Sequence, residues 1–304
     1  MRIATAEVGR VGVFHRRGFL AAGLAAAAQL PVGGVWARAR ATQSEAFFKA
    51  LEERVGGRAG LAALDTQSGK GLFWRADERF AMCSSFKWLL AAETLSLAES
   101  HGLALDEAIP YSASALLGHS PVTAAHVSHG RMSVEALCAA AVEESDNGAA
   151  NLLLARTGGP EALTAWLRRL GDATTRLDRN EPDLNENLPG DPRDTTTPRA
   201  MVKTMTLLLV GDGLGVDSRT RLLTWLGNCR TGANRLRKGV PQSWTEGDKT
   251  GTGARGAAVD NAIFRPPGRK PVLAAAYLSG SGRTTEVLET ALAEIGRRVA
   301  QSFA

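Results

Sequence analysis

Two residues near position 85 have side chains that suit acyl transfer by a serine nucleophile. Ser84 and Lys87 are three positions apart, so on a helix they would share a face and could exchange a proton. A serine in the first turn of a helix also has backbone N–H groups and the positive end of the helix dipole beside its hydroxyl. We interpret Ser84 as a nucleophile and Lys87 as its proton partner, against the alternative of two solvated surface residues.

A second polar segment, Ser145-Asp146-Asn147, lies between two helical patterns. A turn at this place would aim Ser145 and Asn147 into a cleft and leave Asp146 to anchor the backbone. The same residues could instead form an ordinary N-cap for the helix that follows.

A third segment, Lys249-Thr250-Gly251, falls in a strand-like run towards the end of the chain. Alternation along a strand would direct Lys249 and Gly251 away from the face of Thr250, and the glycine would let a ligand approach the backbone closely. An ordinary edge strand could have the same residues. The three segments therefore indicate a site chiefly because they occur together.

Periodic patterns indicate which elements would carry these segments. Helices are expected at residues 44–55, 84–100, 133–143, 148–156, 160–170, 198–210, 217–225 and 283–300. Strands are expected at residues 60–65, 71–75, 243–250, 257–264 and 271–279, with hairpin turns at Thr66–Lys70 and Pro266–Arg269.

The expected strands lie at both ends of the sequence, and the middle is expected to be all helix. This order predicts an α/β (α+β) fold in which one antiparallel sheet is built from both chain ends and packs against a helical insert. No low-complexity linker divides the chain, so one domain over residues 40–304 is expected. Its α/β part would comprise residues 40–80 and 226–304, and its helical part residues 81–225. The three segments would meet where the two parts meet.

Residues 1–39 have the pattern of an export signal. Arg16-Arg17 precede an apolar run, Ala21–Leu30, and Ala37-Arg38-Ala39 would suit a signal peptidase. The run is too short to span a bilayer, and the paired arginines are typical of a twin-arginine signal. We expect cleavage near residue 39 and a periplasmic protein.

The signal also carries most of the net charge. The chain has 36 Lys and Arg residues against 31 Asp and Glu residues, and its formal net charge is +5. Five of the basic residues and one acidic residue fall within residues 1–39, which leaves +1 for the remainder. This charge does not support binding to nucleic acid or to a membrane surface. A monomer without such partners is expected.

Neither a disulfide framework nor a metal site is expected. The cysteines are odd in number: Cys83, Cys138 and Cys229. His119, His126 and His129 have no carboxylate or fourth ligand at a zinc spacing. No metal or other cofactor is therefore expected.

Together, the segments Ser84–Lys87, Ser145–Asn147 and Lys249–Gly251 resemble the motifs of the penicillin-recognising serine enzymes, and the full set resembles class A β-lactamases. The resemblance covers nearly all of residues 44–304. It implies a five-stranded antiparallel sheet beside a helical part, with a β-lactam as the small-molecule substrate.

Glu181 distinguishes the β-lactamases within that superfamily. Release of the acyl group needs a base that holds a water above the ester, and the resemblance implies that Glu181 and Asn185 do this. It also implies an ion pair between Arg179 and Asp194 across the neck of the loop that they bound, and a cis bond between Glu181 and Pro182.

The resemblance also implies the steps of the reaction. Ser84 would attack the lactam carbonyl while Lys87, or Glu181 through a water, takes its proton. Ser145 would pass a proton to the departing nitrogen, helped by Lys87 and Lys249. Backbone N–H groups of Ser84 and Thr252 would form the oxyanion hole.

Other residues would hold the substrate. The resemblance implies that its carboxylate is bound by four side chains: Lys249, Thr250, Thr252 and Arg235. Asn147 would bind the amide of its side chain.

Three features depart from the commonest class A pattern. His119 stands where the aromatic gate residue is usually Tyr or Trp, and it could stack on the substrate or be a plain surface histidine. Cys83 precedes the nucleophile as in carbapenem-hydrolysing members, but Gly253 takes the place of their partner cysteine, so that disulfide cannot form. Arg235 and Thr252 resemble residues found in the same carbapenem-hydrolysing members. The order of preferred substrates stays open.

Two rival functions use the same serine motifs. A β-lactam sensor would be expected to have a membrane-spanning partner segment and to form a stable acyl-enzyme. A D-alanyl-D-alanine peptidase would not be expected to carry the loop from Glu181 to Asn185. The sequence therefore favours a β-lactam hydrolase.

Overall fold

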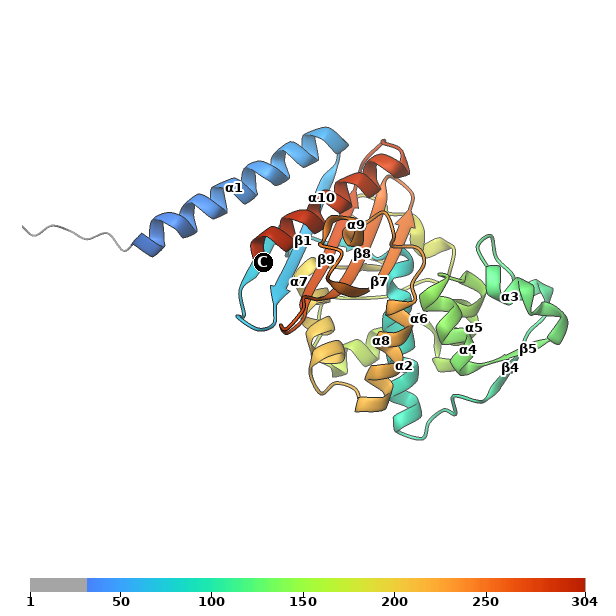
Figure 1. Ribbon diagram of the computed structural model, residues 1–304. Helices are drawn as coiled ribbons and strands as arrows, with labels where there is room; N and C mark the ends of the chain where they lie inside the picture. The colour runs from blue at the N-terminus through green and yellow to red at the C-terminus, as the bar shows by residue number, and fades with distance from the viewer. Residues whose placement is uncertain (1–31, 304) are drawn as a thin grey trace, which may run out of the picture. The chain divides into compact units, whose positions relative to one another are not determined.

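The strands belong to one large sheet and two small ones (Figure 1). The computed structural model describes residues 32–303, and the part from Ser44 onward forms one compact unit. The strands are Arg58–Asp65 (β1), Gly71–Trp74 (β2), Phe80–Ala81 (β3), Ala108–Pro110 (β4), Arg131–Ser133 (β5), Thr195–Thr196 (β6), Thr245–Gly253 (β7), Ala257–Arg265 (β8) and Val272–Ser279 (β9).

The α-helices lie mainly between β3 and β7 in the sequence. They are Val32–Val55 (α1), Lys87–Glu99 (α2), Pro121–Ala125 (α3), Val134–Glu143 (α4), Asn147–Thr157 (α5), Gly159–Arg169 (α6), Pro198–Met205 (α7), Val216–Gly227 (α8), Leu236–Gly239 (α9) and Thr285–Phe303 (α10). Short 3-10 turns include Cys83–Phe86 (η1) and Asp183–Asn185 (η4), and Thr206–Val210 (η5) is a π-helical turn.

The large sheet is antiparallel in the order β2, β1, β9, β8, β7. β1 pairs with β9 over its whole length, with Arg58 opposite Ser279 and Asp65 opposite Val272. Both predicted hairpins are present, since β1 pairs with β2 and β8 with β9. The prediction of a five-stranded sheet built from both chain ends is confirmed.

Alternate residues of the sheet face two different cores, as the two-residue repeat of a strand requires. On β9, Ala275 and Tyr277 pack with the helical part, whereas Ala274 and Ala276 pack with α10 and with Phe48 of α1. α7 covers β1 and β9 on the first of these faces, and α10 covers the second (Figure 1).

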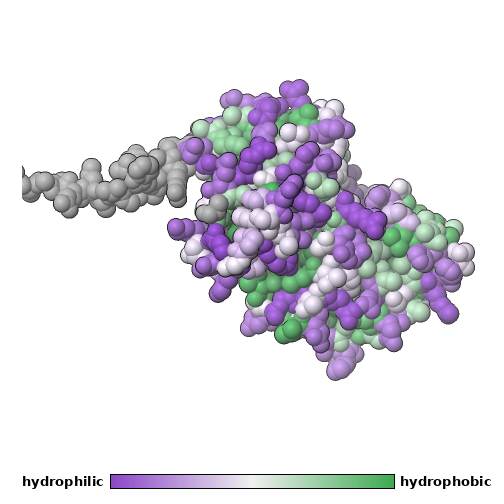
Figure 2. Space-filling model, in the orientation of Figure 1, coloured by the Kyte–Doolittle hydropathy of each residue, from purple (hydrophilic) through white to green (hydrophobic). Residues whose placement is uncertain are grey.

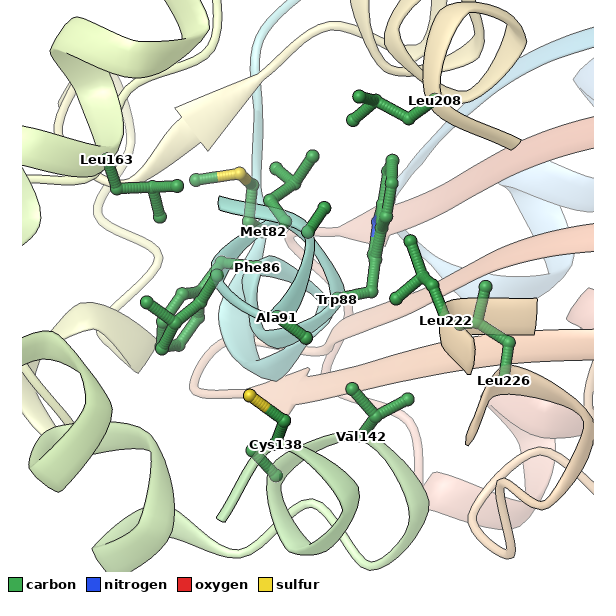
Figure 3. Packing of buried hydrophobic residues seen from close by; sticks show 14 of the residues in the cluster. Met82, Phe86, Trp88, Ala91, Cys138, Val142, Leu163, Leu208, Leu222 and Leu226 are labelled. Atoms are coloured by element: carbon green, nitrogen blue, oxygen red, sulfur yellow. The ribbon is translucent and has the colours of Figure 1, made fainter. Parts of the chain in front are cut away.

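α2 lies at the centre of the helical part. In Figure 3 it is surrounded by side chains that include Cys138 and Val142 of α4 and Leu222 of α8. Every residue from Lys87 to Leu95 is buried, and a helix buried on all sides is expected to be apolar all round. Lys87 departs from this rule, because an ammonium group is fully buried at the start of the helix.

Most predicted elements are present, with four differences. Ser84 lies in the 3-10 turn η1 rather than in α2, which begins at Lys87. β7 continues beyond residue 250 to Gly253, because it pairs with β8 as far as Ala257. The last turn of the helix expected at 198–210 is π-helical. α1 begins at Val32, twelve residues before its expected start.

The prediction that the middle of the chain is all helix was wrong. β3 pairs with β6, and β4 pairs with β5. These strands have two or three residues each, so they are too short to show a periodic pattern.

The expected signal lies outside the described residues, except that residues 32–39 begin α1. Within residues 32–303, no helix has the length and apolar character to cross a membrane. Purple, hydrophilic residues dominate the face drawn in Figure 2, and green ones form small areas between them.

Candidate active site

Ser84 and Lys87 form the centre of the site. The Nζ atom of Lys87 donates a hydrogen bond to the Oγ atom of Ser84 at 2.9 Å, so the predicted pair is in contact. Cys83, just before the serine, has a φ of +45°. A positive φ is strained for a residue with a side chain, and such strain is found mainly at functional sites.

Gly251 allows β7 to lie against the turn that carries Ser84. A Cβ atom at this position would be 2.6 Å from the carbonyl oxygen of Met82 and 3.0 Å from the Cβ atom of Cys83. We predicted close approach of a ligand here, but the close neighbour is the protein's own backbone. The glycine therefore brings Lys249 and Thr252 up to the nucleophile.

Lys87 is held by more than the serine. Its Nζ atom donates to the carbonyl oxygen of Ser145 at 2.8 Å and to Oδ1 of Asn147 at 2.5 Å. Burial lowers the pKa of Lys87 to about 8, although the negative charge of Glu181 acts in the opposite direction. A lysine with this pKa can exchange a proton near neutral pH.

Ser145 points towards Lys249 on the opposite side of the site. The Nζ atom of Lys249 donates to Oγ of Ser145 at 3.0 Å and to the carbonyl oxygen of Thr250 at 3.0 Å. Burial lowers the pKa of Lys249. Ser145 also has a positive φ, +58°, so this short loop holds its serine in an unusual backbone conformation.

Asp146 holds that loop in place, as predicted. Its carboxylate is buried and accepts hydrogen bonds from the backbone N–H groups of Val122, Thr123 and Ala149 and from the Thr123 hydroxyl. The bond from Ala149 makes Asp146 the N-cap of α5. Asp146 therefore both anchors the turn and caps the helix that follows, which are the two interpretations that the sequence left open.

Glu181 reaches the nucleophile from the other side. Its Oε1 atom accepts a hydrogen bond from Oγ of Ser84 at 2.9 Å and lies 2.9 Å from Nζ of Lys87. Its Oε2 atom accepts one from Nδ2 of Asn185 at 2.6 Å. Both oxygens of this buried carboxylate therefore have partners, and the residues are those that the sequence singled out.

The loop that carries Glu181 is fixed at its neck. Nε of Arg179 lies 2.6 Å from Oδ2 of Asp194, whose side chain is only 1% exposed. Oδ1 of Asp194 accepts the backbone N–H groups of Asp178 and Arg179 at 2.8 and 3.0 Å. The peptide bond between Glu181 and Pro182 is cis. Both expectations for this loop are confirmed.

Asn151 was not predicted, yet it holds the backbone of Glu181. Its Oδ1 atom accepts the Glu181 N–H at 3.0 Å, and its Nδ2 atom donates to the Glu181 carbonyl at 2.8 Å. The sequence contains one signal that could have found it, because Asn151 follows Asn147 by four residues on α5 and so shares its face.

Arg235 is buried beneath the end of β7. Its Nη2 atom donates to Oγ1 of Thr252 at 2.6 Å, and Nη1 donates to the carbonyl oxygens of Gly251 and Val259, each at 2.8 Å. Its Nε atom lies 3.4 Å from Oε1 of Glu289 on α10. The sequence did not suggest Glu289, which lies more than fifty residues away and in no motif.

Thr250 and His119 lie at the edges of the site. The hydroxyl of Thr250 is hydrogen-bonded to that of Thr231, another unpredicted neighbour. His119 is exposed, and its Nε2 atom is 3.0 Å from the carbonyl oxygen of Glu144. The carbonyl of His119 accepts the N–H of Asn147 at 2.7 Å, so its backbone belongs to the site although its ring faces solvent.

Cys83 is a free, fully buried thiol. Burial raises the pKa of its side chain to about 12, so it is not a thiolate nucleophile at neutral pH. A Cβ atom at Gly253 would be 2.7 Å from its Sγ atom, which agrees with the expected position of a partner cysteine that this chain lacks. In residues 32–303, no cluster of three His, Cys, Asp or Glu side chains could hold a metal ion.

This fold, with a serine in contact with a buried lysine and a buried glutamate, is that of a serine enzyme for acyl transfer. Residues 43–303 match the β-lactamase enzyme family. The chain is 48% identical to "Beta-lactamase AST-1" of Nocardia asteroides, over 84% of this chain and 82% of that protein. It is 42% identical to "Beta-lactamase CTX-M-8" of Citrobacter amalonaticus, over 87% and 91%.

Solved structures agree. The class A β-lactamase of the last common ancestor of Gram-negative bacteria is 50% identical, with a TM-score of 0.84 over 86% of this chain and 99% of that one. The putative class A β-lactamase PenP of Rhodopseudomonas palustris is 47% identical, with a TM-score of 0.83 over 87% and 100%. The protein therefore belongs to the β-lactamase family, in class A.

Proposed function

We infer that the protein hydrolyses the amide bond of β-lactams through an acyl-enzyme on Ser84, and so confers resistance to β-lactam antibiotics. One observation supports this more than any other. The hydroxyl of Ser84 lies 2.9 Å from both Nζ of Lys87 and Oε1 of Glu181. One site thus holds a nucleophile, a lysine of lowered pKa and a carboxylate that is placed to act on an ester at the same serine.

In the first step, Oγ of Ser84 forms a bond to the lactam carbonyl carbon and gives its proton to Lys87, or to Glu181 through a water. The backbone N–H groups of Ser84 and Thr252 would stabilise the negative oxygen that develops. The C–N bond of the lactam then breaks. Ser145, hydrogen-bonded to Lys249 at 3.0 Å, would give its proton to the nitrogen and regain one from the lysines.

The substrate would be held on both sides of Ser84. We propose that Lys249, Thr250 and Thr252 bind its carboxylate, with Arg235 acting through its 2.6 Å hydrogen bond to Thr252. Asn147 would bind the amide of the substrate side chain. His119 would line the entrance.

In the second step, Glu181 would accept a proton from a water whose oxygen attacks the ester carbon. The bond to Oγ of Ser84 breaks, and the serine takes up the proton that Glu181 accepted from the water, directly or through Lys87. Asn185, which donates to Glu181 at 2.6 Å, would orient the carboxylate and the water. This step separates a hydrolase from a peptidase or a sensor, in which the acyl-enzyme persists when a β-lactam binds.

A chromogenic cephalosporin tests this function. We expect many turnovers for each enzyme molecule, and no comparable release of D-alanine from a peptide that ends in D-alanyl-D-alanine. Colour equal to one equivalent of enzyme, without further turnover, would reject the hydrolase in favour of the sensor. Faster release of D-alanine would favour the peptidase.

We also propose that residues 1–39 are a twin-arginine signal, that the mature enzyme is periplasmic and that it is a monomer. The arginine pair and the apolar run of the sequence support the first two points. Replacement of Arg16 and Arg17 by lysine should retain the enzyme in the cytoplasmic fraction. Light scattering should give one chain per particle.

A further inference from the structure

A second cavity, which shares no residue with the site around Ser84, lies between the β1–β2 hairpin and α7. Its volume is about 540 Å³, within the range of small-molecule sites. Apolar side chains form its walls: Leu64, Phe73, Val202 and Leu207. Nothing in the proposed reaction uses this cavity.

The register of the hairpin turns its apolar side chains towards α7. Phe73 is paired with Ala62, so the two side chains lie on the face of the sheet that α7 covers. Phe73 is nevertheless 44% exposed. Among the side chains described, those of residues 43–303, only Val216 is a more exposed large hydrophobic residue, and an exposed aromatic side chain is consistent with the wall of a binding site.

The floor of the cavity is formed where α7 changes into the π-helical turn η5. Thr206 and Leu207 of this turn line the cavity, and the N–H of Gly211 donates to the carbonyl oxygen of Thr206, five residues earlier, at 2.8 Å. π-helical turns are uncommon and occur frequently at functional sites. This irregular turn therefore supports a binding site at the cavity independently of the apolar walls.

The rim of the cavity has an unneutralised positive charge. Arg199 is already paired, because its Nε and Nη2 atoms lie 2.7 and 3.0 Å from the carboxylate of Asp77, and its Cζ atom lies 4.3 Å from the centre of the Phe73 ring. Lys203 follows on the same face of α7 and is exposed. Among residues 43–303, whose side chains the structure describes, none forms a hydrogen bond or an ion pair with its ammonium group.

We propose that this cavity binds a hydrophobic monocarboxylate, such as a medium-chain fatty acid. The hydrocarbon part packs between Leu64, Phe73 and Leu207, and the carboxylate binds Lys203 at the rim. An anion is favoured over a neutral lipid because the paired Arg199 and Asp77 leave the charge of Lys203 without a partner. A single carboxylate suffices to neutralise it.

Decanoate is a suitable probe, and calorimetric titration of the whole enzyme measures its affinity. We expect one saturable site. Lys203→Gln should weaken decanoate binding about tenfold, which is the loss of roughly one charge-assisted hydrogen bond. Phe73→Ser should weaken it to a similar degree, because it removes an apolar wall from a partly exposed position where folding is little affected. Decanol should bind to the wild type more weakly than decanoate does. To Lys203→Gln, decanol and decanoate should bind with equal affinity.

Lys238→Gln is the matched control, since this exposed lysine lies on α9, which packs on α10 at the other face of the sheet. Its affinity for decanoate should equal that of the wild type. Absence of saturable binding, or equal affinity in Lys203→Gln and the wild type, would overturn the proposal. So would inhibition of cephalosporin hydrolysis that is strictly competitive and unchanged in Lys203→Gln, because decanoate would then occupy the serine site.

Discussion

The ammonium group of Lys87 lies 2.9 Å from Oε1 of Glu181, and both side chains are fully buried. In a buried pair of this kind, each charge is costly without the other. Lys87 already has a pKa lowered to about 8 by burial. Replacement of Glu181 will therefore remove the proposed base for deacylation and also change the pKa of Lys87, beside the nucleophile.

Glu181→Gln should separate the two chemical steps. Acylation of Ser84 should continue, while kcat should fall by about 10²- to 10⁴-fold, the usual contribution of a general base. Mass spectrometry of the intact protein during turnover should show the acyl-enzyme as the main species. Glu161→Gln, an exposed position on α6, should behave as the wild type. Turnover by Glu181→Gln at the wild-type rate would contradict the proposed deacylation.

The same variant should reveal the titration of Lys87. The carboxylate of Glu181 raises the pKa of Lys87, which burial has lowered to about 8, so its replacement by glutamine should lower this pKa further. A neutral lysine is needed to accept the serine proton. The single-turnover rate of acylation by Glu181→Gln should therefore rise with pH, with a midpoint below 8. A slow rate that does not vary with pH would indicate that Glu181 is the acylation base instead.

Asp146→Ala should destabilise the protein by about 2–4 kcal/mol, since three backbone N–H groups and one hydroxyl lose their acceptor in a buried place. Urea unfolding measures this loss. Asp146→Asn keeps one acceptor oxygen and should be less destabilised. Equal stability of Asp146→Ala and the wild type would show that Asp146 does not hold the Ser145 loop.

Glu93, on α2, should make stability depend on pH. Burial raises the pKa of this carboxyl from 4.5 to about 8 in the folded protein, and its side chain is almost fully buried. The folded state thus favours the protonated form. Its stabilising contribution is full below the unfolded pKa and is lost as the pH rises from there to about 8.

Glu93→Gln removes this titration without a change of size. The free energy of unfolding of Glu93→Gln, relative to that of the wild type, should increase by at least about 1 kcal/mol between pH 5 and pH 7.5. Denaturant unfolding at both pH values tests the sign. A constant difference between the two proteins would mean that Glu93 titrates normally.

Gly253→Ala should slow deacylation selectively. The added Cβ atom would lie 2.6 Å from the carbonyl oxygen of Asn185 and 2.7 Å from Sγ of Cys83, so Asn185 must shift, and its hydrogen bond to Glu181 should be disturbed. We expect a fall of about tenfold or more in the deacylation rate and a smaller effect on acylation. Rapid-mixing kinetics resolve the two steps. Gly282→Ala, where an added Cβ atom meets nothing within 4 Å, should change neither.

The sequence was most informative where one short motif provides several groups. The spacing of Ser84 and Lys87 predicted their contact, because one helical turn determines the distance between them. The long elements and both hairpins were also recognisable. Asn151 and Glu289 were not, since each touches the site through a contact that depends on how distant segments pack. The strands β3 to β6 were missed for another reason, because two or three residues are too few to show a periodic pattern.

The pairing of β1 with β9 also determines the stage of synthesis at which the active site can form. The nucleophile is synthesised in the first third of the chain, whereas β7 to β9 and α10 lie in its last fifth. Non-local pairing of this kind forms late and exposes unpaired strand edges meanwhile. We therefore expect a nascent chain to remain without a working site until its C-terminal strands leave the ribosome, and chains that end prematurely to be targets for proteolysis.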